Sequence, residues 1–347
     1  MNPLIERNQQ HIRDIFAGTA RRHAFMHQPA PVSLTQVGDY TLSREPIQKW
    51  VPWVADEYRR RVDSLERFHD DLVPLAKLST GTQIFAQSFG CKVHIPPEDM
   101  PCAIPLVTCA AEADKLEVPD IWKTECLYRV FELGRAVQRE LGKDVDLGPC
   151  DMQTGFDIAA QIWDKNDLLC AMVTEPDAVK RLSAKCALLL KTFLIALRKE
   201  FPTMSPCHCP GNWVPPHLGP WVSNDEAGIM SPEMFETFCL PELKDLSETF
   251  GSLGMHCCAD AEHQFPGFNK IPNFYAFNRV QSKHGYLPIL DHFAGPDAPV
   301  HCLAWMSDEA IEQLVTRAPA GTRFIFVHAG DDEKATHEWL ARGAALR

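Results

Sequence analysis

The sequence predicts an α/β protein, a (β/α)8 TIM barrel with an extended N-terminal helical arm. Short apolar segments that are typical of strands alternate with helical patterns along most of the chain, which favours a parallel sheet. The length of 347 residues lies in the range of single α/β barrels. With 45% apolar residues the chain can bury a sizeable core. Given this many alternating units, a closed barrel is favoured over an open sheet.

Residues 1–75 are predicted to form the arm. Its first 18 residues place their apolar side chains on roughly one side, which indicates a short helix. Residues 19–46 contain Pro29, Pro31 and Gly38 and are expected to be irregular. Pro52 can open a helix over residues 52–71, because proline in the first helical turn forfeits no hydrogen bond.

Residues 76–347 are predicted to form the barrel. Helices are expected at 121–142 and 175–200, and Ser231-Pro232 is a good helix start because a capping hydroxyl precedes proline. The predicted strands are GTQIFAQSFG (81–90), CAIPLVT (102–108) and VDLGPCDM (145–152), followed by SLGMHCCAD, NFYAFNRVQ, PVHCLAWM and TRFIFVHAG.

Composition excludes several classes of protein. The formal charge is −12, and no basic cluster offsets it, so nucleic acid is not an expected partner. No apolar run reaches the ~18 residues of a membrane span, and the N-terminus is too polar for a signal peptide. A cytoplasmic protein is therefore expected. Its 13 cysteines are an odd number, which argues against a disulfide framework.

The most informative segment is Met255-His256-Cys257-Cys258. In a barrel the functional residues lie at the carboxyl ends of the strands. His256 and Cys258 are two residues apart, so on a strand both side chains point to the same side. An imidazole beside a thiolate is half of a zinc site. The alternative is a histidine bonded to a backbone carbonyl beside buried cysteines.

A catalytic zinc site needs a third protein ligand and one open position. His328 ends the last predicted strand, and His301 and Cys302 lie on the strand before it. The residues alone do not decide among them.

Other motifs are weaker. Cys207-His208-Cys209 stands in a proline-rich loop, which is expected near the barrel mouth with incidental cysteines. Asn224-Asp225-Glu226 precedes a helix and is either a solvated turn or a set of carboxylates facing the pocket. Neither a phosphate-binding glycine loop nor a GxSxG elbow occurs.

The order of VDLGPCDMQTGFDIAAQIW, DLLCAMVTEPDAVKRL, WVSNDEAGIMSPEMFETFCLPELKDLSETFG and GMHCCAD resembles the uroporphyrinogen decarboxylase superfamily. The resemblance covers roughly residues 75–345 and implies a (β/α)8 barrel with an N-terminal arm. True decarboxylases of this superfamily carry a PxWxMRQAGRY-like signature, whereas this chain has HQPAPVSLTQVGDY. The chain is closer to the branch of zinc-dependent methyltransferases that work with corrinoid proteins, whose mark is H-x-C plus a distant cysteine.

The resemblance implies a zinc ion held by His256 and Cys258 that activates a thiol for methyl transfer. Relatives also run the reverse direction, in which a methylated small molecule is the donor. In place of the branch's last cysteine this chain has His328, which we predict as the third ligand in preference to Cys302, since His328 would sit at the barrel rim. Cobalamin is expected only on a separate corrinoid protein, because no DxHxxG-type signature occurs.

Asp225, Asp151, Gln153 and Asn278 follow or lie near strand ends and are predicted to contact the substrate. The alternatives to a methyltransferase are a metal-independent decarboxylase or lyase with a carboxylated substrate, and a barrel that binds a ligand without catalysis. The oligomeric state is left open.

Overall fold

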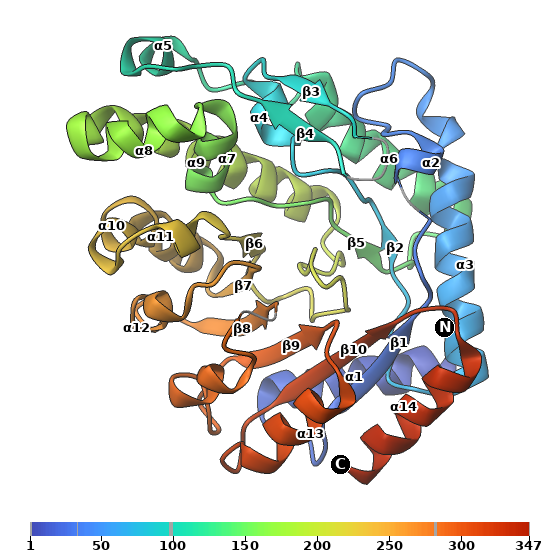
Figure 1. Ribbon diagram of the computed structural model, residues 1–347. Helices are drawn as coiled ribbons and strands as arrows, with labels where there is room; N and C mark the ends of the chain where they lie inside the picture. The colour runs from blue at the N-terminus through green and yellow to red at the C-terminus, as the bar shows by residue number, and fades with distance from the viewer. Residues whose placement is uncertain (1, 33, 97–99, 281–282, 347) are drawn as a thin grey trace.

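The computed structural model describes residues 2–32, 34–96, 100–280 and 283–346 (Figure 1). Strands lie in the middle of the molecule and helices surround them. The strands are β1 (Ala24–Gln28), β2 (Ala76–Lys77), β3 (Lys92–His94), β4 (Cys102–Ile104), β5 (Leu147–Gly148), β6 (Trp221–Ser223), β7 (Leu253–Cys257), β8 (Phe274–Arg279), β9 (Val300–Ala304) and β10 (Phe324–Ala329).

The longer helices pack around these strands. They are α1 (Pro3–Ala17), α3 (Val51–Phe68), α6 (Glu125–Leu141), α7 (Gly155–Ile162), α8 (Lys165–Thr174), α9 (Pro176–Glu200), α11 (Leu240–Phe250), α13 (Asp308–Arg317) and α14 (Glu333–Ala345). Short helices are α2 (Leu34–Val37), α4 (Ile84–Ser88), α5 (Ala110–Lys115), α10 (Pro232–Phe238) and α12 (Phe265–Phe268). The predicted start of α10 is confirmed, because the Ser231 side chain accepts a hydrogen bond from Met234 N. Among the described residues, no helix is both long and apolar enough to cross a membrane.

The central sheet is parallel, as predicted. Six strands pair in the order β1-β10-β9-β8-β7-β6, and β2 pairs in parallel with β5. A parallel bridge between Gln153 and Ser223 links the two sheets. Within the described residues no ladder joins β1 to β2. The structure thus shows an α/β fold with a parallel central sheet, and closure into a barrel stays a prediction.

Alternation along the strands separates an inner from an outer face. Inner side chains, such as Ala276 and Val327, share one apolar cluster with Trp213 of the loop 201–220. Outer side chains, such as Phe277 and Phe326, belong to the cluster that contains the helices. The loop 201–220 therefore packs against the inner face of the strands, where the yellow segment in the middle of Figure 1 lies.

Three segments differ from their predicted structure. GTQIFAQSFG (81–90) contains the helix α4 and no strand, since its buried run of Ile84, Phe85 and Ala86 has no period that separates a helix from a strand. The strand β4 within residues 102–108 pairs antiparallel with β3, outside the central sheet. Residues 19–46, predicted to be irregular, contain the sheet strand β1.

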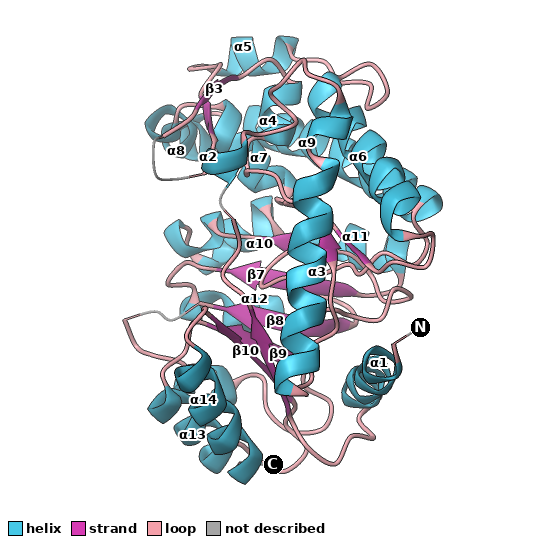
Figure 2. Cartoon of the chain, turned by 90° about the vertical axis from the view of Figure 1, so that its right-hand side faces the viewer, coloured by secondary structure: helices cyan, strands magenta, loops and turns pink. Residues whose placement is uncertain are grey.

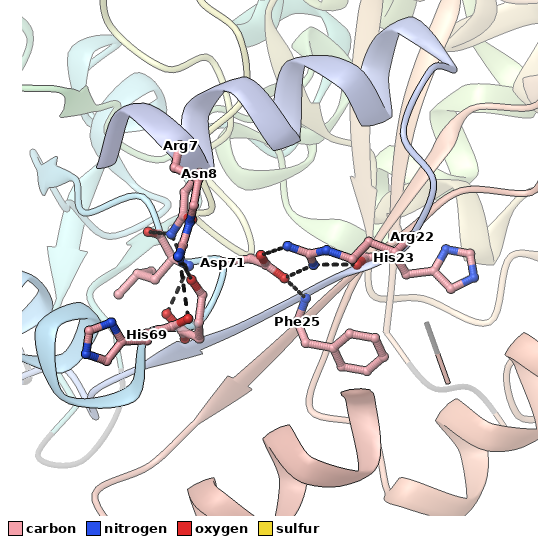
Figure 3. A network of polar contacts seen from close by, with 9 residues as sticks. Arg7, Asn8, Arg22, His23, Phe25, His69 and Asp71 are labelled. Carbon is pink, nitrogen blue, oxygen red and sulfur yellow. Dashed lines mark hydrogen bonds and ion pairs between the residues drawn. The ribbon is translucent and has the colours of Figure 1, made fainter. Parts of the chain in front are cut away.

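The N-terminal segment is firmly attached to the sheet (Figure 3). The buried carboxylate of Asp71 accepts hydrogen bonds from both terminal nitrogens of Arg22, at 2.6 and 2.7 Å, and from Phe25 N at 3.0 Å. Asn8 Nδ2 of α1 donates to the carbonyls of Asp70 and Leu72. Residues 1–75 thus contribute a strand as well as helices, and the division of the chain at residue 75 stays a prediction.

Candidate functional site

Three side chains of different chemistry meet where β6 and β7 end. The carboxylate of Asp225, the imidazole of His256 and the thiol of Cys258 lie within 4.8 Å of one another, measured between their ligand atoms. His256 Nε2 is 3.8 Å from Asp225 Oδ1. His256 and Cys258 come together because they are two residues apart at the end of β7, and Asp225 follows β6, the neighbouring strand.

Asn278 fixes the orientation of the His256 ring. Its side-chain oxygen is 2.5 Å from His256 Nδ1, and its Nδ2 donates to the carbonyl of Cys302. Because Asn278 Nδ2 is the donor to Cys302, Oδ1 accepts a hydrogen bond from the N–H of His256 Nδ1. When the ring is neutral, the lone pair of His256 is then on Nε2, the atom that faces Asp225. Both residues are buried.

The loop that carries Asp225 is held by a second buried carboxylate. Asp157 of α7 accepts hydrogen bonds from Asp225 N at 2.7 Å and from Glu226 N at 3.3 Å. Glu226 in turn forms an ion pair with Lys165. Asp225 itself accepts from Cys258 N at 2.7 Å, so its carboxylate is tied to β7. The choice left open for Asn224-Asp225-Glu226 is thereby decided for Asp225, which faces the candidate site.

The loop 201–220 brings two more groups to this site from inside the sheet. The His208 ring lies 6.3 Å from the His256 ring and nearly perpendicular to it, and His208 Nε2 is 2.9 Å from Ser223 Oγ. Cys209 Sγ is 3.9 Å from Asn278 Oδ1. A loop near the mouth was expected, and its histidine and second cysteine are part of the wall.

The two histidines of the site have pKa values shifted in opposite directions. Burial alone would lower the pKa of His256, but the thiols of Cys209 and Cys258 and the carboxylate of Asp225 raise it well above its usual value. The hydrogen bond with His256 lowers the pKa of Cys258, yet burial and Asp225 outweigh it, so that pKa is raised. Burial lowers the pKa of His208, which is neutral.

Asp151 and Gln153 lie beside this cluster. Gln153 bridges to Ser223 of β6 and its side chain donates to Asp151 Oδ1. The positive charge of His256 acts on the pKa of Asp151, although burial raises that pKa. Asp225, Asp151, Gln153 and Asn278 are therefore all near His256, and their contact with substrate stays a prediction.

The structure does not bring His328 to the cluster, which corrects the predicted third ligand. Its ring stacks on Trp339 of α14, with centroids 5.2 Å apart. Val327 and Ile325 face inward, so His328 belongs to the outer row of β10 with Phe324 and Phe326. The third side chain close to His256 and Cys258 is that of Asp225. Cys302 is buried in the sheet, as expected.

An open cleft with about 1250 Å³ of empty space adjoins the cluster. Its walls come from the carboxyl ends of several strands, with Gln28, Lys77, Trp305 and Ala329 among the lining residues, and from Cys209. Cys209 therefore lines the cleft and also contacts Asn278, the partner of His256.

No sequence pattern indicates Lys77 or the path of the loop 201–220. Lys77 follows no recognisable motif, and its strand β2 has only two residues. The loop contains Cys207-His208-Cys209, but nothing in its sequence shows that it packs against the inner face of the strands.

Comparisons with known proteins agree with this architecture. The uroporphyrinogen decarboxylase (URO-D) family model matches residues 64–201. Comparison with the curated proteins gives no match. Among solved structures, a methyltransferase from Methanosarcina mazei has a similar fold, with a TM-score of 0.67, 11% sequence identity and 98% of each chain covered. The family match and the shared fold confirm the predicted resemblance of this chain to the uroporphyrinogen decarboxylase superfamily.

Proposed function

We propose that this protein is a zinc-dependent methyltransferase that moves a methyl group between a corrinoid protein and a thiol or methylated small molecule. The observation that carries the proposal is the cluster of Asp225, His256 and Cys258 at the carboxyl ends of adjacent parallel strands. The shared fold with a methyltransferase supports the same class of reaction.

The three side chains suit zinc. Nitrogen, sulfur and carboxylate oxygen are its usual ligands, and three protein ligands with a free fourth position are typical of catalytic sites. Asn278 leaves His256 Nε2 available as a ligand and would hold the ring in place, as partners of zinc-bound histidines do. Asp225 and Cys258 are already linked through the Cys258 backbone, which limits the movement needed to bind an ion.

Zinc at this position would lower the pKa of a bound thiol and supply a nucleophile at neutral pH. The protein's own groups set the surroundings. Asn278 holds the His256 ring, Asp157 holds the Asp225 loop, and the loop 201–220 places His208 and Cys209 beside His256 and Asn278. The cleft, which Cys209 lines, gives access beside the cluster.

The cleft is poorly suited to a substrate with many carboxylates, which the decarboxylase alternative requires. Of its basic residues, Arg61 lies 3.8 Å from the carboxylate of Glu57. Lys77 is the other basic residue of the cleft, and it is available to form an ion pair with a carboxylate of the substrate.

Metal analysis tests the proposal directly. Protein purified without chelators should contain about one zinc per chain, and His256→Ala, Cys258→Ser and Asp225→Ala should each lose most of it, because each removes one of three ligands. His328→Ala is the matched control and should keep its zinc, since that ring stacks on Trp339.

Activity is measured as the demethylation of free methylcobalamin by a small thiol, followed by absorbance. Zinc content that is absent in the wild type, or equally high in the three ligand variants, would overturn the proposal.

A further inference from the structure

The cleft beside the metal cluster combines a cation with an aromatic rim. Its lining includes Lys77 of β2 and Cys209, together with Trp53 of α3 and Trp305, which follows β9. Its walls come from β2, α3, the loop 201–220, the segments after β1 and β9, and the end of β10, so the cleft extends well beyond the surroundings of a thiol of a few atoms. The cleft therefore has room and chemistry for a larger substrate than the transferred group requires.

Lys77 is positioned to receive an anion. Among the described residues, Lys77 forms neither an ion pair nor a hydrogen bond. The neighbouring loop packs closely on it, since a Cβ added to Gly211 would be 3.1 Å from Lys77 Nζ. Asp151 is near enough for the charge of Lys77 to lower its pKa, but burial raises that pKa, so Asp151 is a weak counter-ion. A half-buried lysine without an ionised partner close by is a favourable place for an acidic ligand to bind.

Trp305 is the unusual residue of the rim. Its side chain is 58% exposed, although indole is among the costliest groups to leave in water. Its backbone is also in the left-handed region, with φ of 59°, which is rare for a bulky residue. Strained residues of this kind concentrate at ligand sites, where the surrounding structure holds them. An aromatic face held toward an open cleft is suited to stacking on a flat ligand.

We propose that the small-molecule substrate of this site is an aromatic carboxylic acid, whose carboxylate pairs with Lys77 and whose ring packs against Trp305. This inference rests on the proposed function, because it assigns the heteroatom that carries or receives the methyl group to the side of the cleft next to Cys209 and His256. It adds the identity of the substrate class and two residues that select it.

Isothermal titration calorimetry with 4-methoxybenzoate tests the inference on both metal-free and zinc-loaded protein. The matched probes are 4-methoxybenzyl alcohol, which has the ring without the charge, and acetate, which has the charge without the ring. We expect 4-methoxybenzoate to bind at least roughly tenfold more tightly than either, as a charge-assisted hydrogen bond and ring stacking would give.

Variants separate the two contacts. Lys77→Met should weaken 4-methoxybenzoate roughly tenfold or more and leave the alcohol unchanged, whereas Trp305→Ala should weaken both aromatic probes by roughly fivefold. Lys334→Met, an exposed lysine of α14, is the control and should change nothing. Circular dichroism checks that each variant is folded.

The inference is overturned if 4-methoxybenzoate does not bind, binds no better than the alcohol, or binds equally well to Lys77→Met. These results leave the zinc content of the wild type untouched and so do not bear on the proposed function. Conversely, a protein without zinc that still shows Lys77-dependent binding would refute the proposed function and keep the assignment of an aromatic acid.

Discussion

At the scale of single residues, the site depends on the hydrogen bond between His256 and Asn278. Asn278→Ala should lower zinc affinity about 10- to 100-fold, because the ring loses the partner that fixes its orientation. Asn278→Asp keeps an acceptor for Nδ1 and should lose much less. Competition with a chromophoric chelator measures both affinities. Equal losses in the two variants would show that Asn278 acts through packing alone.

His328 shows what the sequence could not decide at this scale. The pair His256 and Cys258 could be predicted, since residues two apart share a face whichever face that is. A ligand from another strand requires knowing which row faces inward. In RFIFVH the apolar side chains on both faces of the strand are buried, so hydrophobicity does not show which face points inward. Position along the strand suggested His328, whereas the outer row of β10 places it on Trp339.

At the scale of elements, the position of the loop that carries Asp225 depends on its hydrogen bonds to Asp157 of α7. Asp157→Ala should reduce the free energy of unfolding by about 2 kcal/mol, since the backbone N–H groups of Asp225 and Glu226 lose a buried acceptor. Zinc affinity should fall with it. Asp167→Ala, on the exposed surface of α8, should change stability by less than about 0.5 kcal/mol. Urea unfolding measures both values. An equal loss of the free energy of unfolding in Asp157→Ala and Asp167→Ala would contradict the role of Asp157 in holding this loop.

Elements with a clear period or cap were predictable and the others were not. The helices α6 and α9 are long and amphipathic, and α10 has its Ser-Pro start, so all three were predicted within a few residues. The strand β1 has five residues and ends in His27 and Gln28 before a proline. This short sequence with a polar end is typical of a loop. The path of the loop 201–220 depends on the space that the strands leave inside, and no local pattern encodes that space.

At the scale of the whole molecule, the two ends of the chain complete one sheet. The strand β1 pairs with β10 over five residues, and Arg22 and Asp71 attach the segment before β1 to the segment that follows α3. In Figure 2 the helix α3 runs along the side of the strands and covers them. The cleft draws on both β1 and β10, so the N-terminal segment belongs to the structure that forms the candidate site.

The stability of the molecule should depend on pH through two buried carboxyl groups far apart in the chain. Burial raises the pKa of Asp70 and that of Glu242 to about 7. Because the folded pKa exceeds the unfolded value of roughly 4, the folded state holds these protons more tightly. Stability from this source is complete below about pH 4 and is lost as the pH rises toward 7.

Glu242→Gln tests this at one of the two groups. Glu242 Oε1 accepts a hydrogen bond from Gly155 N at 2.6 Å, and the amide oxygen of glutamine can accept the same bond. The substitution removes a charge that costs about 3 kcal/mol when it forms in the folded protein, a shift of about 2.5 pKa units converted at 1.36 kcal/mol each. The melting temperature of the variant relative to wild type should therefore be several degrees higher at pH 8 than at pH 5. Glu248→Gln, an exposed change on the same helix, should show no such difference between the two pH values. The difference in melting temperature between Glu242→Gln and the wild type could instead be constant from pH 5 to pH 8. That result would mean that the Glu242 carboxyl is already ionised in the folded protein at pH 5. Burial between α7 and α11 would then not hold its proton.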